Sequence, residues 1–415
     1  MRRVLTFILA GGKGERLHPL TKDRAKPAVP FGGTYRIIDF TLSNCINSSI
    51  RKIHVLIQYK SISLQRHLRM GWNLFSSELG EYIDVIPAQQ RTGDSWYRGT
   101  ADAVYQNIYS IEQEQPDLVL ILAGDHVYKM DYAEMVEFHR RRRADVTVGV
   151  LEMEPARAAG HFGVVEVDAN DRIVGFEEKP ANPKTIPERT GVCYVSMGIY
   201  LFNRSMLESV LIDDAQRQHS THDFGRDVIP AIAPTARVCA YNFRDANKQT
   251  SRYWRDIGTL DAYYEANMDL IQVSPQFNLY DKEWPIRTYQ EQWPPAKTVF
   301  ADEASGRVGA ATDSLIANGC VISGGRVGRS ILSPDVRVNS FALVEDAIVM
   351  EHVQVGRHAK IRRAIIDKDV VIPAHAQIGY DLEEDRRRFH VTESGIVVVG
   401  KGTVIQEAQA AVSVA

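Results

Sequence analysis

A glycine-rich turn near the start of the chain carries the residues whose chemistry is easiest to interpret. Gly11, Gly12 and Gly14 directly follow an apolar run, and two basic residues, Arg16 and Lys26, come after them. Glycine lets backbone N–H groups turn toward an anion with no Cβ in the way. Arginine can bind two phosphate oxygens at once, and lysine adds a point charge. Each basic residue alone is typical of a solvated surface, but together behind a glycine turn they predict a phosphate site.

Two familiar phosphate motifs are excluded at this turn. A P-loop needs a glycine, four residues and then Gly-Lys-Ser or Gly-Lys-Thr, and this stretch does not have that pattern. A dinucleotide fingerprint needs a third glycine at the position where this chain has Leu17. The glycines therefore predict an anion-binding turn without identifying its ligand.

Two carboxylates and a further lysine come later in the chain, and Asp125 and Lys179 among them stand at predicted strand ends. Asp125 follows the apolar run LVLILAG, at the edge where α/β sheets bind ligands, and Asp256 follows an aromatic and basic cluster. Lys179 ends the stretch RIVGFEEK just before a proline, where it is well placed to hold a phosphate. A helix cap or surface aspartate is a poor alternative for Asp125 and a competitive one for Asp256. A solvated cluster is about as good an interpretation of Glu178 and Lys179.

An alternating α/β framework is needed to position these residues. Short apolar runs predict buried strands, and amphipathic segments between them predict helices. The predicted strands are Val4–Ala10, His54–Gln58, Leu118–Ala123, Asp145–Leu151, Gly163–Asp168, Ile173–Glu178 and Met197–Phe202. The predicted helices are Ala101–Gln113, Tyr132–Arg143 and Leu260–Ile271. This alternation predicts an α/β domain with a mainly parallel sheet over residues 1–273.

A proline-rich stretch and then a repeat follow this domain. Residues 274–298 contain four prolines and predict an extended linker on the surface. The segments SLIANGCVI, SILSPDVRV, AIVMEHVQV and AIIDKDVVI align without gaps, and their starts are 16, 17 and 17 residues apart. Their spacing is too short for a pair of helices, and β-branched residues are frequent. They predict the triangular coils of a parallel β-helix over residues 299–415, with a C-terminal tail.

The glycine turn and four further stretches together resemble a known family. LAGGKGERLHPLTKDRAKPAVPFGG resembles the signature of sugar-nucleotide pyrophosphorylases. RIIDFTLSNCINSSI, PAQQRTGDSWYRGTADAV, GDHVYKMDY and YWRDIGTL are similar to bacterial glucose-1-phosphate adenylyltransferases, also called ADP-glucose pyrophosphorylases. The resemblance implies a Rossmann-like nucleotidyltransferase domain with a mixed, mostly parallel sheet, followed by a C-terminal left-handed parallel β-helix.

The resemblance implies a reaction as well as a fold. ATP and α-D-glucose 1-phosphate give ADP-glucose and pyrophosphate, the regulated first step of bacterial glycogen-type α-1,4-glucan synthesis. The attacking phosphate oxygen is already ionised, so positioning and charge neutralisation are expected to supply most of the catalysis. Mg²⁺ suits this chemistry, because it is a hard cation held by one or two carboxylates together with phosphates and water.

Positions that match the family's motifs carry the implied roles. The catalytic residues are Arg16, Lys26 and Asp125, and the magnesium ligands are Asp125 and Asp256. The glucose 1-phosphate residues are Glu178, Lys179 and Ser196. The ATP-binding residues are Gly11, Gly12, Gly14, Gln89, Tyr97, Gly99 and Asp102. For Tyr97, a role in coupling the nucleotide site to an effector site stands beside direct binding.

Regulation by a metabolite is implied too. Family members are typically homotetramers controlled by sugar phosphates or similar effectors, and Arg36, Lys368 and Lys401 match anion-binding positions of the effector pocket. Asp23 and Pro30 depart from the pattern, because some fructose-bisphosphate-activated members carry a basic residue and a histidine there. An acid at an anion pocket weakens attraction. The sequence therefore predicts an allosteric enzyme and leaves its activator open.

Composition limits the alternatives. A net charge of -3 over 415 residues argues against a nucleic-acid partner, and no stretch approaches the roughly 20 apolar residues of a membrane span. Four cysteines without metal-binding or redox spacing fit a reduced, cytoplasmic protein. Two interpretations stay open: transfer from UTP or dTTP to another sugar 1-phosphate, and a non-catalytic regulatory subunit. The stretch Pro87–Val104 argues against the first by resemblance, and the retained charged residues argue against the second.

Overall fold

Two compact units make up the structure. The computed structural model describes residues 1, 3–90, 95–186, 189, 191–245, 250–302 and 304–406. The first unit, which we call the sheet unit, comprises Met1–Gly12, Phe40–Ser61 and Trp72–Trp254. The second, the β-helix unit, comprises Lys13–Asp39, Ile62–Gly71 and Arg255–Ala415. Residues 91–94 of the motif PAQQRTGDSWYRGTADAV lie outside the described residues. The domain boundaries predicted at residues 273 and 298 stay a prediction.

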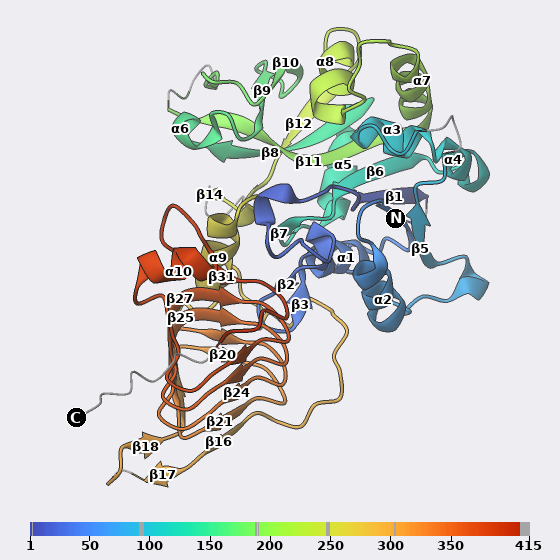
Figure 1. The fold of residues 1–415 in the computed structure, drawn as a ribbon. Coiled ribbons are helices and arrows are strands. Elements are labelled where there is room, and N and C mark those ends of the chain that lie inside the picture. Colours follow the sequence, from blue (N-terminus) through green and yellow to red (C-terminus); the bar gives the residue numbers. More distant parts are fainter. Residues whose placement is uncertain are drawn as a thin grey trace. The chain divides into compact units, whose positions relative to one another are not determined.

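A nine-stranded mixed sheet forms the centre of the sheet unit (Figure 1). Its main path runs through β10 (Ile173–Glu178), β9 (Gly163–Val167), β11 (Cys193–Asn203), β6 (Leu118–Ala123), β1 (Val4–Leu9), β4 (Lys52–Ile57) and β5 (Tyr82–Pro87). In addition, β8 (Val146–Met153) pairs with β11, and β12 (Val238–Asn242) pairs with β8. The neighbours β6, β1, β4 and β5 are parallel, whereas β11 is antiparallel to β6. The predicted mixed sheet with a parallel centre is confirmed.

Burial on both faces explains why the central strands are continuous apolar runs. Leu5 and Phe7 of β1 are buried on one face of the sheet, and Val4 and Ile8 are buried on the other. Each of the seven predicted strands is present, with ends shifted by up to a few residues. The strand predicted at Met197–Phe202 is the largest change, because β11 begins at Cys193.

Helices flank these strands along the chain. The helices that lie between them are α3 (Thr100–Tyr105), α4 (Ile108–Glu114), α5 (Tyr132–Arg142), α6 (Pro155–Ala158), α7 (Arg204–Ala215) and α8 (Ile229–Ile232), with a π-helical turn at Phe224–Val228. The prediction of one continuous helix at Ala101–Gln113 is wrong, because the helix is interrupted between α3 and α4. At the break Asn107 uses its side-chain amide to donate to the Ala103 carbonyl at 2.8 Å, a local bond that competes with a regular helix.

Smaller elements complete the region before the repeat. These are the 3-10 turns Glu15–Leu17, Lys26–Ala28 and Ser77–Leu79, the helices α1 (Ile37–Asn47), α2 (Ile62–Gly71) and α9 (Leu260–Asp269), and the short strands β2 (Pro30–Phe31), β3 (Tyr35–Arg36), β7 (His126–Tyr128), β13 (Arg244–Asp245), β14 (Thr250–Ser251) and β15 (Trp254–Asp256). Residues 274–296 carry no regular element, as predicted for the linker. They are not wholly on the surface, however, because Phe277 and Ile286 are buried.

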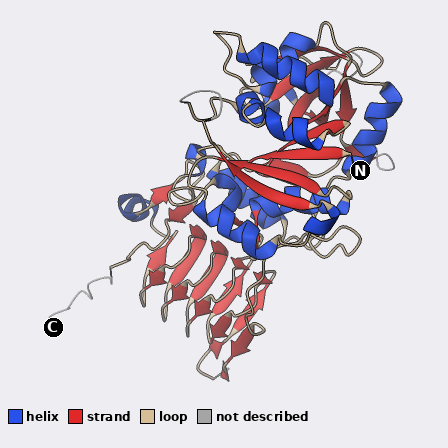
Figure 2. Ribbon diagram, turned by 90° about the vertical axis from the view of Figure 1, so that its right-hand side faces the viewer, coloured by secondary structure: helices blue, strands red, loops and turns tan. Residues whose placement is uncertain are grey.

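Three rows of short parallel strands build the sides of the β-helix, whose stacked coils are visible in Figures 1 and 2. The first row is β16 (Lys297–Val299), β21 (Val321–Ser323), β24 (Arg337–Val338), β26 (Gln354–Val355) and β28 (Val371–Ile372). The second is β19 (Ala310–Thr312), β22 (Arg326–Gly328), the first halves of β25 (Leu343–Val349) and β27 (Lys360–Ile366), and β29 (Gln377–Ile378). The third is β20 (Leu315–Ile316), β23 (Ile331–Leu332), the second halves of β25 and β27, and β31 (Val397–Val399). Between β16 and β19 in the sequence, β17 (Ala301–Asp302) and β18 (Arg307–Val308) form a two-stranded antiparallel ribbon.

The strand register confirms the repeat read from the sequence. Leu315 pairs with Ile331, Ile331 with Ile348, and Ile348 with Ile365, which are the predicted steps of 16, 17 and 17 residues. At the corner inside β25, Asp346 turns the chain with a left-handed backbone (φ 48°). The three rows and these corners confirm the triangular coil.

An insertion interrupts the last coil. Ala364 of β27 pairs with Val397 of β31, and the chain between them forms α10 (Leu382–Arg388) and β30 (His390–Val391). Asp381 accepts hydrogen bonds from the backbone N–H groups of Glu383 and Glu384 and so begins α10, whose sequence LEEDRRR is charged after its first residue. No helix among the described residues is long and apolar enough to cross a membrane.

Candidate functional site

The glycine turn is folded tightly against Lys26. Gly14 has a left-handed backbone (φ 65°), and its carbonyl accepts a hydrogen bond from the Thr21 hydroxyl at 2.8 Å. A Cβ on Gly14 would stand only 3.0 Å from the Cβ of Lys26. Both the backbone angle and this close approach require glycine here. The turn thus brings backbone and a lysine together, as a phosphate site needs.

Three of the predicted charged residues gather around Gly258 in the β-helix unit. The Nζ atom of Lys26 lies 3.1 Å from Oδ1 of Asp256, and the Lys26 side chain is only 10% exposed. A Cβ placed on Gly258 would stand 2.8 Å from Oδ2 of Asp256 and 3.4 Å from Nη2 of Arg16. A buried ammonium needs a counter-charge, and Asp256 supplies it. Sequence reasoning missed Gly258, whose only signal is its place two residues after Asp256.

Asp125 occupies the ligand edge of the sheet unit. It follows β6 and Gly124, whose N–H donates to the Leu9 carbonyl at 3.0 Å, so the ends of β6 and β1 are held together. A Cβ on Gly124 would stand 3.2 Å from that carbonyl, so glycine allows the close approach. Nε2 of His126 lies 3.5 Å from the Asp125 carboxylate. Asp125 therefore stands at the carboxyl edge of the parallel strands, as predicted.

The donor chemistry of both predicted metal aspartates fits a hard cation. The side chains of Asp125 and Asp256 are 31% and 22% exposed, so neither carboxylate is sealed in the interior. Carboxylate oxygen is the ligand type that Mg²⁺ prefers, with the remaining positions filled by phosphate and water.

Lys179 stands in an unusual backbone conformation at the end of β10. Its φ is 52°, in the left-handed region, which costs a non-glycine residue about 1–2 kcal/mol. Its N–H donates to the Phe162 carbonyl at 3.1 Å, and its Nζ lies 3.8 Å from Oε1 of Glu178. The half-exposed ammonium thus ends the strand beside the carboxylate predicted to bind the sugar.

Sequence reasoning missed Asp223, which lies beside Glu178. The Asp223 carboxylate accepts hydrogen bonds from the N–H groups of Gly225 and Arg226 at 2.9 and 3.0 Å. A Cβ on Gly225 would stand 3.1 Å from Oε2 of Glu178. Burial raises the pKa of Glu178 above its ordinary value, and the nearby charge of Asp223 raises it further. Asp223 is therefore held close enough to Glu178 to make its carboxylate harder to ionise.

Ser196 belongs to the same group of polar side chains. It lies on β11, where its hydroxyl accepts from the Gly198 N–H at 3.3 Å and lies 3.5 Å from the Tyr200 hydroxyl. Burial raises the pKa of Tyr200, and the charges of Asp223 and Glu178 add to the effect. The sheet unit thus brings together Glu178, Lys179 and Ser196, with Tyr200 and Asp223 as members that the sequence did not indicate.

The predicted ATP residues of the sheet unit have different surroundings. Gln89 is exposed just after β5. The Tyr97 hydroxyl accepts from the Asn107 amide at 2.9 Å. Asp102 is buried, and its carboxylate accepts from the Arg98 N–H at 2.8 Å, so it holds the start of α3. A Cβ on Gly99 would stand 2.3 Å from the His222 carbonyl oxygen, so only glycine fits there.

Two of the three predicted effector residues line one cavity in the β-helix unit. Arg36 and Lys368 share a cavity of about 300 Å³ with Glu351 and His67. Burial lowers the pKa of Lys368, although its ion pair with Glu351 opposes that shift. Lys401 is not among the lining residues and lies 3.5 Å from Asp369.

Asp23 and Pro30, where this chain departs from the fructose-bisphosphate-activated members of the family, lie in different environments. Asp23 is exposed, and Pro30 is buried at the start of β2. Between them, Arg24 is buried and binds both oxygens of Asp367, at 2.9 and 3.1 Å. Sequence reasoning missed this pair, whose members are 343 residues apart.

Comparison with known proteins agrees with this arrangement. The nucleotidyl transferase family model matches residues 5–273, and the model of the GlmU-like C-terminal hexapeptide matches residues 294–399. A glucose-1-phosphate adenylyltransferase of Rhodopirellula baltica is 56% identical over 98% of this chain and 91% of its own length. Relatives of the same name from Koribacter versatilis and Methylococcus capsulatus are 55% and 54% identical, each over 96% of this chain and 95% and 93% of their own.

The chain belongs to the glucose-1-phosphate adenylyltransferase family. The resemblance seen in the sequence motifs is therefore confirmed over almost the whole chain. The fold class is confirmed as well, since the two matched families fall on the sheet with its helices and on the parallel coils, consistent with the predicted left-handed β-helix.

Proposed function

We propose that this protein makes ADP-glucose and pyrophosphate from ATP and α-D-glucose 1-phosphate. The observation that carries the proposal is the near full-length identity with relatives named glucose-1-phosphate adenylyltransferase. The cluster of Arg16, Lys26 and Asp256 around Gly258 supports a catalytic protein rather than a non-catalytic regulatory subunit. The product would enter bacterial glycogen-type α-1,4-glucan synthesis, of which this is the regulated first step.

Charge neutralisation by Arg16 and Lys26 is the proposed basis of the chemistry. A phosphate oxygen of glucose 1-phosphate forms a bond to the α-phosphorus of ATP, while the bond from that phosphorus to the departing pyrophosphate breaks. Negative charge grows on the leaving group, and two fixed cations lower its energy. Because Lys26 is nearly buried, its charge acts through less water than a surface lysine would. The ion pair with Asp256 holds the Lys26 side chain in place.

Positioning of the nucleophile falls to the sheet unit. Lys179 holds the phosphate of glucose 1-phosphate, Glu178 accepts hydrogen bonds from sugar hydroxyls, and Ser196 lies beside them. An ionised Glu178 is required for that role, which links its raised pKa to substrate binding. The proposed ATP-binding residues are Gly11, Gly12, Gly14, Gln89, Tyr97, Gly99 and Asp102.

Mg²⁺ is the proposed cofactor, with Asp125 and Asp256 as its protein ligands. Their partly exposed carboxylates have the right donor chemistry. A bound Mg²⁺ would neutralise phosphate oxygens as charge shifts to pyrophosphate. Asp125 is therefore assigned a catalytic role with Arg16 and Lys26.

Regulation by a sugar phosphate or similar metabolite is proposed at the cavity of Arg36 and Lys368, with Lys401 as a further anion contact. The basic side chains and the volume of about 300 Å³ support a small anionic effector. Exposed Asp23 and buried Pro30 leave its identity open. We propose that the protein acts in the cytoplasm as a homotetramer, the assembly typical of the family.

Pyrophosphate release tests the function directly. The purified protein would be given Mg²⁺, glucose 1-phosphate and one nucleoside triphosphate at a time, with and without glycolytic metabolites. Release with ATP is the expected result, and the metabolite that raises the rate identifies the effector. Release with UTP or dTTP would keep the mechanism and change the product. No release with any triphosphate would instead favour a regulatory subunit.

A further inference from the structure

A short segment joins two parts of the predicted site within the sheet unit. We call residues 220–225 the connector. Its first half is held from behind by Asp214 of α7, whose carboxylate accepts hydrogen bonds from the Ser220 hydroxyl and from Nδ1 of His222, both at 2.7 Å. Asp214 and His222 are buried, and His222 has a left-handed backbone (φ 57°). The connector is therefore fixed in a conformation that a free loop would seldom adopt.

One end of the connector holds the start of α3. The His222 carbonyl accepts hydrogen bonds from the N–H groups of Ala101 at 2.7 Å and Asp102 at 3.4 Å. The first N–H groups of a helix have no partner within it, and Gly99 offers no side chain to cap them. The connector thus supplies the cap for α3, which carries the predicted ATP residue Asp102 and directly follows Gly99.

Thr100 forms a second link at the same place. Its hydroxyl donates to Oδ2 of Asp223 at 2.9 Å and accepts from the Phe224 N–H at 2.9 Å. One side chain of α3 thus fixes both the carboxylate and the backbone of the connector. Asp223 in turn lies beside Glu178, whose pKa it raises, and Gly225 packs against the Glu178 carboxylate.

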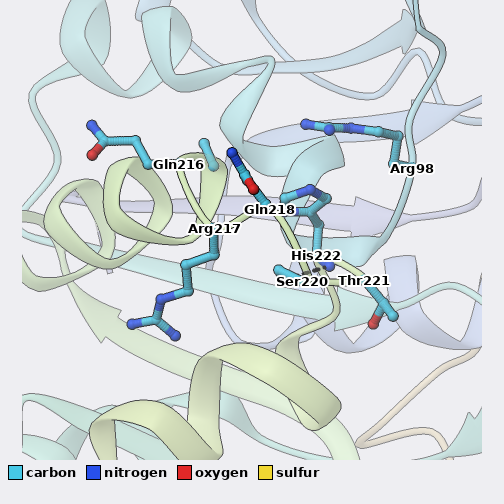
Figure 3. A pocket seen from close by; sticks show the side chains of 8 residues that line it. Arg98, Gln216, Arg217, Gln218, Ser220, Thr221 and His222 are labelled. Carbon is cyan, nitrogen blue, oxygen red and sulfur yellow. Dashed lines mark hydrogen bonds between the residues drawn. The ribbon is translucent and has the colours of Figure 1, made fainter.

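A cavity borders the first half of the connector. A cavity of about 410 Å³ lies there, lined by Arg98 and by the loop that leads from α7 into the connector. Figure 3 shows His222 in this loop below Gln218, with Ser220 and Thr221 beside it. Hydrogen bonds to Asp214, Thr100 and Asp227 hold the connector beside this cavity, since the Asp227 carboxylate accepts from the Thr221 hydroxyl and from the Asp223 N–H at 3.0 Å. Phe224 is buried in the core and anchors the far end.

We propose that the connector couples the nucleotide and sugar halves of the active site, with Thr100 and His222 as positioning residues. This inference rests on the proposed function. A nucleotide that orders the start of α3 fixes Thr100, and Thr100 fixes Asp223 beside Glu178. Binding of the nucleotide therefore prepares the sugar side, and the coupling acts equally in the other direction.

Binding of each substrate with and without the other tests the coupling. Dissociation constants for glucose 1-phosphate would be measured by calorimetry, in the presence of Mg²⁺, without and with a non-hydrolysable ATP analogue. For the unaltered protein we expect the analogue to tighten glucose 1-phosphate binding by about tenfold, within the usual range for coupled sites. In Thr100→Val, which keeps the branched shape and loses the hydroxyl, this factor should fall below about twofold.

Thr100→Ser is the matched control, because it retains the hydroxyl, and it should keep the coupling. Asp214→Asn gives a second test, because it alters the carboxylate that binds Ser220 and His222. It should weaken the coupling, although Asp214 is not among the predicted substrate-binding residues. Coupling of unaltered size in both Thr100→Val and Asp214→Asn would overturn the proposal, as would its absence from the unaltered protein. Pyrophosphate release by the unaltered protein distinguishes failure of the proposed function from failure of the proposed coupling. If no pyrophosphate is released, the proposed function is wrong. If pyrophosphate is released but the two substrates bind independently, only the proposed role of the connector is wrong.

Discussion

Gly258→Ala offers a sharp test of the charged cluster, because the added methyl group would come closer than van der Waals contact to one functional atom and would only touch Arg16, at 3.4 Å. The new Cβ would stand 2.8 Å from Oδ2 of Asp256, the end of a side chain that can move. The carboxylate would have to shift by roughly 0.6 Å to reach ordinary van der Waals contact. The backbone of Gly258 is not left-handed, so alanine adds no strain there. The fold should therefore survive while the carboxylate moves.

The expected cost falls on turnover. A misplacement of about 1 Å can cost about a hundredfold in rate, so a shift of this size should lower kcat by about tenfold or more. Lys26 is paired to the other oxygen of Asp256 at 3.1 Å, so its position should change too. We would measure kcat and both KM values from pyrophosphate release, the Mg²⁺ concentration that gives half the maximal rate, and the melting temperature.

Gly328→Ala is the matched control. Its Cβ would meet only the Thr312 hydroxyl, at an ordinary 3.9 Å, and Gly328 lies in the β-helix away from the charged cluster. We expect normal kinetics from it. A Gly258→Ala protein with unaltered kcat and unaltered Mg²⁺ dependence would refute the assignment of Asp256, while a large drop in its melting temperature would contradict the argument that only a side chain moves.

Four further predictions concern single groups. Because burial and the charge of Asp223 raise the pKa of Glu178, acidification should weaken glucose 1-phosphate binding at a higher pH than it would with an ordinary glutamate. Asp223→Asn removes that charge and lowers the pKa of Glu178, so the acidic limb of the kcat/KM profile should move to lower pH. An acidic limb that stays in place would contradict this. Lys179→Gln should raise the KM for glucose 1-phosphate by about ten- to a hundredfold, the worth of a charge-assisted hydrogen bond, and a raised KM for ATP alone would place the lysine on the wrong substrate. Asp125→Ala should abolish turnover with the circular dichroism spectrum unchanged, and normal activity would remove the metal assignment. Lys368→Gln should reduce activation by the effector about fivefold or more, which the ratio of activated to basal rate measures, and full activation would move the effector elsewhere.

Local patterns were sufficient for the framework of the molecule. Strands β1 and β6 are buried on both faces, so their sequences are continuous apolar runs that no amphipathic helix would show. In the β-helix each coil repeats the same apolar positions, and the steps of 16 and 17 residues became the observed register. Asp125 was placed correctly at the sheet edge because it follows such a run directly.

The same local patterns do not predict contacts between residues that are far apart in the sequence. Lys26 and Asp256 are 230 residues apart, and nothing local to either indicates the ion pair. Asp223 was overlooked because its closeness to Glu178 depends on the turn after α7. The helix predicted over α3 and α4 failed at Asn107, where one side-chain hydrogen bond outweighs a regular apolar period. In these cases the deciding contact is either distant in the chain or a single polar bond.

The ion pair of Arg24 with Asp367 limits how early the N-terminal segment can finish folding while the chain is being synthesised. The two residues are 343 positions apart, so at about 5–20 residues per second the ribosome finishes the second roughly 20 to 70 seconds after the first. Until then Arg24 has no Asp367 to balance it, and a guanidinium is not buried alone. The N-terminal segment with Arg16 and Lys26 therefore completes its folding only when the last coils emerge. Nascent chains stalled before residue 367 should be cut by protease within residues 13–39, whereas released full-length chains should resist; equal resistance would show that the segment folds earlier.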